Sequence, residues 1–173
     1  MIFVTAGTQG PFNRMIRAID DWAVRNDRHD VFAQIGRHAW HPTRIQWVEH
    51  LGAREFHSCV GDADIVISHA GMGTILTALE LGKPLLIMPR RAALLEQRND
   101  HQVATARKLE ELGLATVAKD EEELAELLLH LDQLKARRHE RTTERNRLLE
   151  TLRRFLETGS GGVARARRRS DHA

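Results

Sequence analysis

Two kinds of apolar pattern alternate along this chain. Short apolar runs occur at residues 2–4, 30–36, 45–48, 65–67, 84–88 and 114–118, and each predicts a buried strand. Between them, apolar residues recur every three or four positions, as at Phe12, Met15, Ile16, Ile19 and Trp22. Strands that alternate with helices across short loops predict an α/β fold, with a Rossmann-like open parallel sheet and helices on both faces.

Individual residues mark where the helices start and stop. Pro11 suits the first position of the first helix, and Asp120 suits the N-cap of the last one. Gly82 and Gly113 suit the left-handed position that follows a helix C-terminus. The pattern predicts helices over 11–22, 74–81, 99–112 and 120–134, with a turn or short helix over 56–63.

Charge divides the chain into two parts. Residues 1–134 hold 14 Lys/Arg and 19 Asp/Glu, a balance of −5, whereas residues 135–173 hold 12 and 5, a balance of +7. We expect a folded domain over 1–135 and, over 136–173, a basic Arg-rich helix followed by a disordered tail. Two interpretations of this extension remain open. It is a solvated helix, or its charge attracts an anionic membrane or a partner protein. Nucleic acid is not expected as a ligand, because the domain itself is acidic.

Three loops follow predicted strands and should meet at one edge of the sheet, where α/β proteins bind ligands. They are 5–10, 68–74 and 90–101. In the second loop, Gly71 and Gly73 allow close approach to a ligand, and the following helix directs free N–H groups and its positive dipole end at it. A diphosphate fits such a place, although a plain strand-to-helix turn with packing glycines is the alternative. His69 favours the diphosphate site, because an imidazole there can donate to a phosphate oxygen.

The segment Asn99-Asp-His-Gln offers amide, carboxylate and imidazole groups at a helix start. Sugar hydroxyls need such mixed donors and acceptors, so Asp100 and Gln102 are candidate sugar contacts. The alternative is an ordinary helix cap formed by Asn99, and both can hold together.

Other chemistry is not expected. Asp62-Ala-Asp64 resembles a metal-binding D-x-D motif, but it precedes a strand and so belongs at the edge away from the ligand. No His/Cys set has zinc spacing, so we predict neither a metal nor a cofactor. The single Cys59 predicts no disulfide and fits a cytoplasmic protein, as does the absence of a signal peptide or membrane span.

The residues from Ser68-His-Ala-Gly-Met-Gly-Thr to Asn99-Asp-His-Gln resemble the glycosyltransferase family 28 C-terminal domain. The start, Phe3-Val-Thr-Ala-Gly-Thr-Gln-Gly-Pro-Phe, fits too. More narrowly, the chain is similar to the soluble subunit of split transferases, known from GlcNAc transfer to dolichol-linked sugar and from exopolysaccharide and capsule assembly. The resemblance implies the donor-binding C-terminal half of a GT-B fold and a UDP-sugar as the substrate.

The resemblance also implies roles for individual residues. Gly71, Met72, Gly73 and Thr74 would meet the diphosphate, and His101 with Gln102 would touch the donor sugar. Gly7 and Thr8 of the first loop join this set. Many relatives hold the ribose through an acidic residue where this chain has Thr77, so Thr77 is the remaining candidate for that contact.

The implied reaction is metal-independent inverting transfer of a hexose to a lipid-linked saccharide. The general base and the acceptor site would lie on a separate, membrane-anchored partner subunit, and this chain would be peripheral at the inner face of the membrane. A non-catalytic accessory subunit that stabilises or recruits such an enzyme is the alternative function.

Overall fold

The fold is known from a computed structural model of the 173-residue chain, which describes residues 1–136 and 150. The chain divides into two compact units, residues 1–140 and 141–173, and the fold below is that of the first. Apart from Ala136 and Glu150, the predicted basic extension lies outside the described residues.

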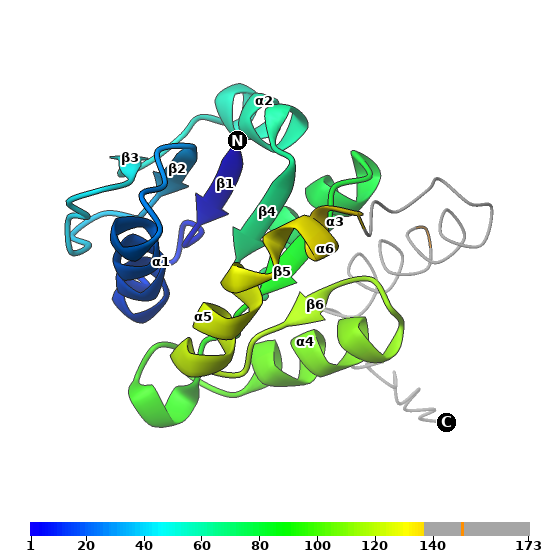
Figure 1. The fold of residues 1–173 in the computed structure, drawn as a ribbon. Helices are drawn as coiled ribbons and strands as arrows, with labels where there is room; N and C mark the ends of the chain where they lie inside the picture. Colours follow the sequence, from blue (N-terminus) through cyan, green and yellow to red (C-terminus); the bar gives the residue numbers. More distant parts are fainter. Residues whose placement is uncertain (137–149, 151–173) are drawn as a thin grey trace, which may run out of the picture. The chain divides into compact units, whose positions relative to one another are not determined.

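All six strands of the sheet run parallel, in the order β3-β2-β1-β4-β5-β6 (Figure 1). The sheet grows outward from β1 in both directions, so the strand order reverses between β1 and β4. Strands β1, β4 and β5 are buried throughout, as expected of a parallel sheet covered on both faces. The strands are β1 (Ile2–Thr5), β2 (Val31–Gln34), β3 (Gln46–Val48), β4 (Ile65–Ser68), β5 (Leu85–Ile87) and β6 (Thr116–Val117).

The strand register sets which loops meet. Thr5 at the end of β1 lies opposite Gln34 on β2 and Ser68 on β4, and Ser68 lies opposite Ile87 on β5. The four strands therefore end at one level, and the loops that follow them leave from the same edge of the sheet. We call this the carboxyl edge, and the opposite one the amino edge.

Helices cover both faces, as the sequence predicts. On one face, α1 (Asn13–Arg25), α5 (Glu121–Leu129) and α6 (Leu131–Ala136) pack against the sheet (Figure 1). The stripe Met15, Ile16 and Ile19 of α1 is fully buried in this core. Burying a side chain of this size contributes roughly 1.5–3 kcal/mol.

On the other face lie α2 (Ala53–Asp62) and α3 (Met72–Glu80), and α4 (His101–Glu111) packs beside β6. Phe3 of β1 meets the Phe56 ring of α2 edge-on, with 5.6 Å between the ring centroids. A 3-10 turn, η1 (Ala92–Leu94), lies between β5 and α4. This face carries the N-termini of three helices toward the carboxyl edge.

Several element boundaries differ from those predicted. Helix α1 begins at Asn13 after the cap Phe12, so Pro11 lies before the helix; the Pro11 carbonyl is bound by Arg90 instead. The segment expected over 56–63 is a full helix from Ala53, because the Glu55 carboxylate accepts from the Gly52 amide and secures an earlier start. The last helix breaks between α5 and α6, and Leu134 beyond the break still packs into the same core.

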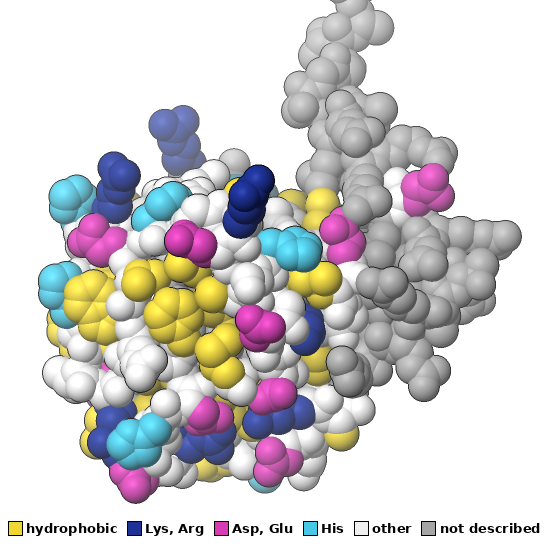
Figure 2. All heavy atoms as spheres, turned by 90° about the horizontal axis from the view of Figure 1, so that it is seen from above, with side chains coloured by type: hydrophobic (Ala, Val, Ile, Leu, Met, Phe, Trp, Pro, Cys, Tyr) yellow, Lys and Arg dark blue, Asp and Glu magenta, His cyan; other side chains and the backbone are white. Residues whose placement is uncertain are grey.

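One face of the folded unit carries charges of both signs (Figure 2). Seen from above in Figure 2, hydrophobic side chains gather in the middle of the face, with acidic, basic and histidine side chains interspersed around them. This face therefore presents no field of a single sign to a nucleic acid or a membrane. Within the described part of the chain, no helix is both long and apolar enough to span a bilayer.

Candidate functional site

A cavity of about 630 Å³ opens at the carboxyl edge, where the strand order reverses. This is the position at which open α/β sheets bind their ligands. Segments far apart in the sequence line it: the loop after β1, the start of α2, the loop after β4 and the start of α4. Ten of the eleven residues predicted from the sequence lie on its wall, namely Gly7, Thr8, His69, Gly71, Met72, Gly73, Thr74, Thr77, His101 and Gln102.

The loop after β1 forms one wall. Gly7 adopts φ +80°, which a residue with a side chain rarely takes, and its amide donates to Thr5 Oγ1 at 3.1 Å. The next two amides, of Thr8 and Gln9, donate to no acceptor within residues 1–136. The loop therefore offers main-chain donors to whatever fills the cavity.

The N-terminus of α3 forms the facing wall. Gly71 is the N-cap and its amide donates to the His69 carbonyl at 2.9 Å. The amides of Met72, Gly73 and Thr74 have no acceptor among the described residues, as is usual in the first turn of a helix. Together with the helix dipole they make a place for an anion.

His69 lies between these two walls. The residue is 8% exposed, and a Cβ added to either Gly7 or Gly71 would overlap its ring. Burial lowers the pKa of His69 to about 4, the Arg90 charge adds to this effect, and a backbone interaction with Thr5 opposes it. The imidazole is thus neutral at pH 7, so a phosphate would meet a neutral donor there rather than a cation. Its Nδ1 is buried and makes no hydrogen bond of normal geometry.

The start of α4 contributes polar groups of a different kind. Gln102 is 2% exposed, and its Oε1 accepts from the Arg90 amide at 3.2 Å. His101 is exposed and its ring contacts Asn99 Oδ1. Asp100, the eleventh predicted residue, is the N-cap of α4 but does not line the cavity. Its carboxylate accepts from the Ala92 amide at 2.9 Å and so holds the preceding turn.

Two threonines on the cavity wall use their hydroxyl protons within their own helices. Thr77 Oγ1 donates to the Gly73 carbonyl and Thr105 Oγ1 to the His101 carbonyl, each at 2.9 Å. Thr77 can therefore only accept from a ribose hydroxyl, whereas a carboxylate at this position would accept two bonds.

The structure adds residues that the sequence analysis missed. Gln34 ends a strand beside β1, so the order of the strands would have placed it here. The start of α2 was missed because its helical pattern is recognisable only from Phe56 onward. The added residues are Thr5, Gln9, Gln34, His50, Leu51, Ala53, Phe56, His57, Ala70 and Thr105.

The Asp62–Asp64 pair lies at the amino edge, as its place before β4 predicts. Asp62 ends α2, and Asp64 pairs with the amino group of Met1 at 2.6 Å. Within residues 1–136 and 150, no group of three or more His, Cys, Asp or Glu is arranged to hold a metal ion. Cys59 is half-buried, and burial raises the pKa of its thiol.

Comparison with known families decides the classification. The model of the glycosyltransferase family 28 C-terminal domain matches residues 1–155. The chain belongs to this family.

Curated relatives include two fungal proteins named UDP-N-acetylglucosamine transferase subunit ALG13. The one from Eremothecium gossypii is 37% identical over 90 residues, which are 51% of this chain and 42% of the relative. The one from Cryptococcus neoformans is 41% identical over 70 residues, 39% of this chain and 33% of the relative. The chain thus matches less than half the length of these relatives.

Solved structures show the same fold. The NMR structure of ALG13 has a TM-score of 0.52 at 20% identity, covering 73% of this chain and 82% of that one. The structure of MurG from Acinetobacter baumannii has a TM-score of 0.58 at 19% identity, covering 88% of this chain and 49% of that one. The structure of Os79 from O. sativa in complex with UDP has a TM-score of 0.59 at 14% identity, covering 89% of this chain and 40% of that one. The α/β, Rossmann-like fold is that of one half of a GT-B glycosyltransferase.

Proposed function

We propose that this chain is the donor-binding subunit of a two-component glycosyltransferase and that its cavity binds a UDP-sugar. One observation carries the proposal: two segments of unpaired amides, Thr8–Gln9 and Met72–Thr74, line the same cavity at the strand-order reversal. A diphosphate carries enough oxygens and negative charge to accept from both segments. The family and the ALG13 relatives support a nucleotide sugar as its source.

The rest of the cavity suits the two ends of such a donor. Leu51 and Phe56 supply apolar surface of the kind that a uracil ring needs, beside the imidazole of His57. His101 and Gln102 supply hydrogen-bonding groups for sugar hydroxyls. The substrate is therefore proposed to lie with its base toward α2 and its sugar toward α4.

In this proposal the reaction is an inverting transfer of a hexose. An acceptor hydroxyl attacks the anomeric carbon, the bond to the diphosphate breaks, and UDP leaves while the amides of α3 stabilise its growing charge. The low pKa of His69, about 4, makes its buried imidazole a weak base for removing the acceptor proton. That base, the lipid-linked saccharide acceptor and the membrane anchor are assigned to a partner subunit, in polysaccharide or glycolipid synthesis at the cytoplasmic face.

A substitution at Gly73 tests the proposal. A Cβ at Gly73 meets nothing within 4 Å, so a larger side chain extends into open space beside the α3 amides. Gly73→Leu should weaken UDP binding by about a hundredfold without loss of stability, because a leucine also favours the helix. Gly61 of α2 has equally open surroundings, which makes Gly61→Leu the matched control.

Calorimetric titration of both variants with UDP gives the answer. If Gly73→Leu binds UDP with unchanged affinity, the proposal that this cavity is the donor site is wrong. A transfer assay with the partner then separates the catalytic role from an accessory one. Lost transfer with intact partner association supports the donor-binding role, and unchanged transfer supports a subunit that only stabilises or recruits the enzyme.

A further inference from the structure

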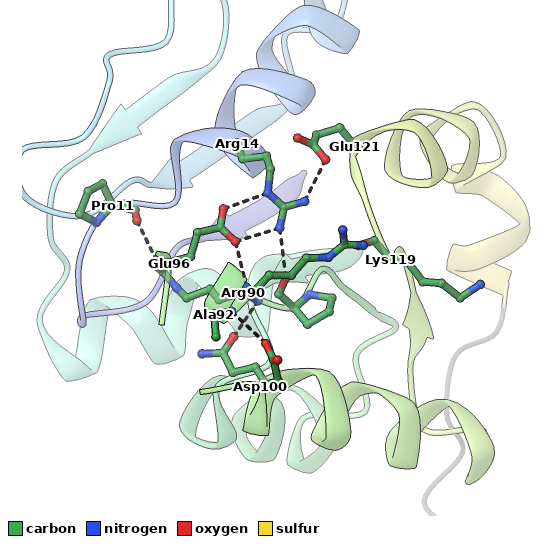
Figure 3. Close-up of polar contacts among 11 residues, drawn as sticks. Pro11, Arg14, Arg90, Ala92, Glu96, Asp100, Lys119 and Glu121 are labelled. Atoms are coloured by element: carbon green, nitrogen blue, oxygen red, sulfur yellow. Dashed lines mark hydrogen bonds and ion pairs between the residues drawn. The ribbon is translucent and has the colours of Figure 1, made fainter. Parts of the chain in front are cut away.

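Arg90 is a buried arginine directly behind the first wall of the cavity. It follows β5 and Pro89, is 3% exposed, and reaches back to the loop after β1. Its Nη2 donates to the carbonyls of Ala6 at 2.9 Å and Gly10 at 2.7 Å, and its Nη1 donates to that of Pro11 at 2.8 Å. Figure 3 shows the bond to Pro11. One side chain therefore holds both ends of the Ala6–Pro11 loop.

Within the described part of the chain, Arg90 carries its charge without an ion-pair partner. Among the described residues no carboxylate pairs with it, because the nearby Glu96 binds Arg14 through two bonds of 2.9 Å (Figure 3). The guanidinium instead lies over the Phe12 ring, 4.7 Å from its centroid, and its Nε is buried without a hydrogen-bond acceptor. Burial lowers the pKa of Arg90, and Glu96 opposes this shift. A buried cation without a counter-ion is costly to a fold and asks for an explanation.

The three carbonyls that Arg90 binds explain part of the reason for burying this charge. A loop binds an anion only if its amides face the anion while its carbonyl oxygens, which repel negative charge, face elsewhere. Arg90 engages the carbonyls of Ala6, Gly10 and Pro11, and Gln34 Nε2 lies 3.4 Å from that of Gly7. The amides of Thr8 and Gln9 in the same loop stay unpaired at the cavity.

Arg90 also connects this loop to the other end of the site. Its main-chain amide donates to Gln102 Oε1 at 3.2 Å, at the start of α4. The turn between them is closed by the bond from the Ala92 amide to Asp100 (Figure 3). The residue thus lies between the proposed phosphate-binding loop and the proposed sugar-binding helix.

We propose that Arg90 is a positioning residue for the diphosphate: it holds the carbonyls of the Ala6–Pro11 loop away from the cavity, directs the Thr8 and Gln9 amides into it, and places a positive charge with no ion-pair partner among the described residues behind them. The diphosphate brings the counter-charge. This inference rests on the proposed donor site.

The test compares UDP with uridine on the 173-residue chain. Arg90→Gln should weaken UDP binding by about tenfold or more, as expected for lost charge-assisted hydrogen bonds, and uridine binding by less than about threefold. Arg90→Lys keeps the positive charge but cannot bind all three carbonyls in the same way. Its UDP affinity should lie between those of the wild-type protein and Arg90→Gln. In wild-type protein UDP should shift the amide NMR signals of Thr8 and Gln9, and in Arg90→Gln these shifts should be absent.

Arg28→Gln is the matched control, because Arg28 also lies over an aromatic ring, at 5.3 Å from Trp22, but pairs with Asp30 away from the cavity. It should leave the UDP-to-uridine affinity ratio unchanged. The inference is overturned if the Arg90 variants lose UDP and uridine affinity equally, or lose neither. If Arg90→Gln does not fold, the ratio of UDP affinity to uridine affinity in Arg90→Lys tests the inference instead. Wild-type protein that binds no UDP would instead contradict the donor site itself.

Discussion

The two edges of the sheet treat their polar groups differently. At the amino edge the fold satisfies them: the Asp20 carboxylate, 2% exposed, accepts from the amides of Thr43, Arg44 and Ile45 at 2.9–3.0 Å. Lys83 likewise donates to the Ala63 carbonyl at 2.9 Å. The exception is the Nε of Arg44, an arginine whose terminal nitrogen pairs with Asp27.

At the carboxyl edge, by contrast, groups are left unpaired. The amides of Thr8–Gln9 and Met72–Thr74, the Nδ1 of His69 and the Nε of Arg90 make no hydrogen bond of normal geometry within the described chain. Nearly all buried polar groups in folded proteins are paired. Thr8, Gln9 and Gly73 are exposed, so water can reach their amides, whereas the Nδ1 of His69 and the Nε of Arg90 are buried. The amino edge closes the fold, and in the proposed function the carboxyl edge takes the diphosphate.

The largest effect expected from this contrast concerns two glycines with similar backbone angles. Gly7 at the carboxyl edge has φ +80° and Gly113 at the amino edge has φ +65°, but only at Gly7 would a Cβ overlap another group, the His69 ring. Gly7→Ala should lower the free energy of unfolding by roughly 4 kcal/mol and abolish UDP binding. Gly113→Ala should cost only about 1 kcal/mol and leave binding intact.

Urea unfolding and UDP titration of the two variants check this pair. Equal losses of stability would mean that the His69 ring moves aside freely. In that case the positive φ of each glycine would account for the whole loss of stability in both variants.

The next effect is a pH dependence from His69. Its pKa is about 4 in the folded protein against about 6.5 in the unfolded chain, so the unfolded state binds the extra proton first as the pH falls. The stabilising contribution is complete above pH 6.5 and is lost as the pH falls to 4, by about 3 kcal/mol. His69→Asn should lack this slope in urea unfolding between pH 7 and 4. A slope identical to that of wild-type protein would show that His69 is not held neutral by the fold.

Much of the fold follows from local patterns in the sequence. All six strands lie within or beside the predicted apolar runs, and the glycines at 82 and 113 follow α3 and α4 with positive φ. The Asp120 carboxylate accepts from the Glu123 amide at 2.9 Å, which confirms the predicted cap. The loop over 68–74 is predictable because glycines that follow a buried strand indicate a tight turn of the backbone.

The rest depends on contacts between distant segments. The bond from Arg90 to the Ala6 carbonyl joins positions 84 residues apart, and nothing near Arg90 in the sequence marks it. The neutral state of His69 follows from burial between two loops, which the sequence does not reveal.

The smallest expected effect lies at the amino edge, in the Asp62–Asp64 pair. Asp64 is 57% exposed and pairs with the Met1 amino group, which holds the pKa of the carboxyl below its usual range. Because exposed ion pairs contribute little, Asp64→Asn should cost less than about 1 kcal/mol in urea unfolding. If the amides at the carboxyl edge hold the diphosphate without a metal, UDP affinity should be the same for wild-type, Asp62→Asn and Asp64→Asn protein, with EDTA or with Mg²⁺. UDP binding that requires Mg²⁺ and is lost in both variants would move the nucleotide to the amino edge and reverse the comparison of the two edges.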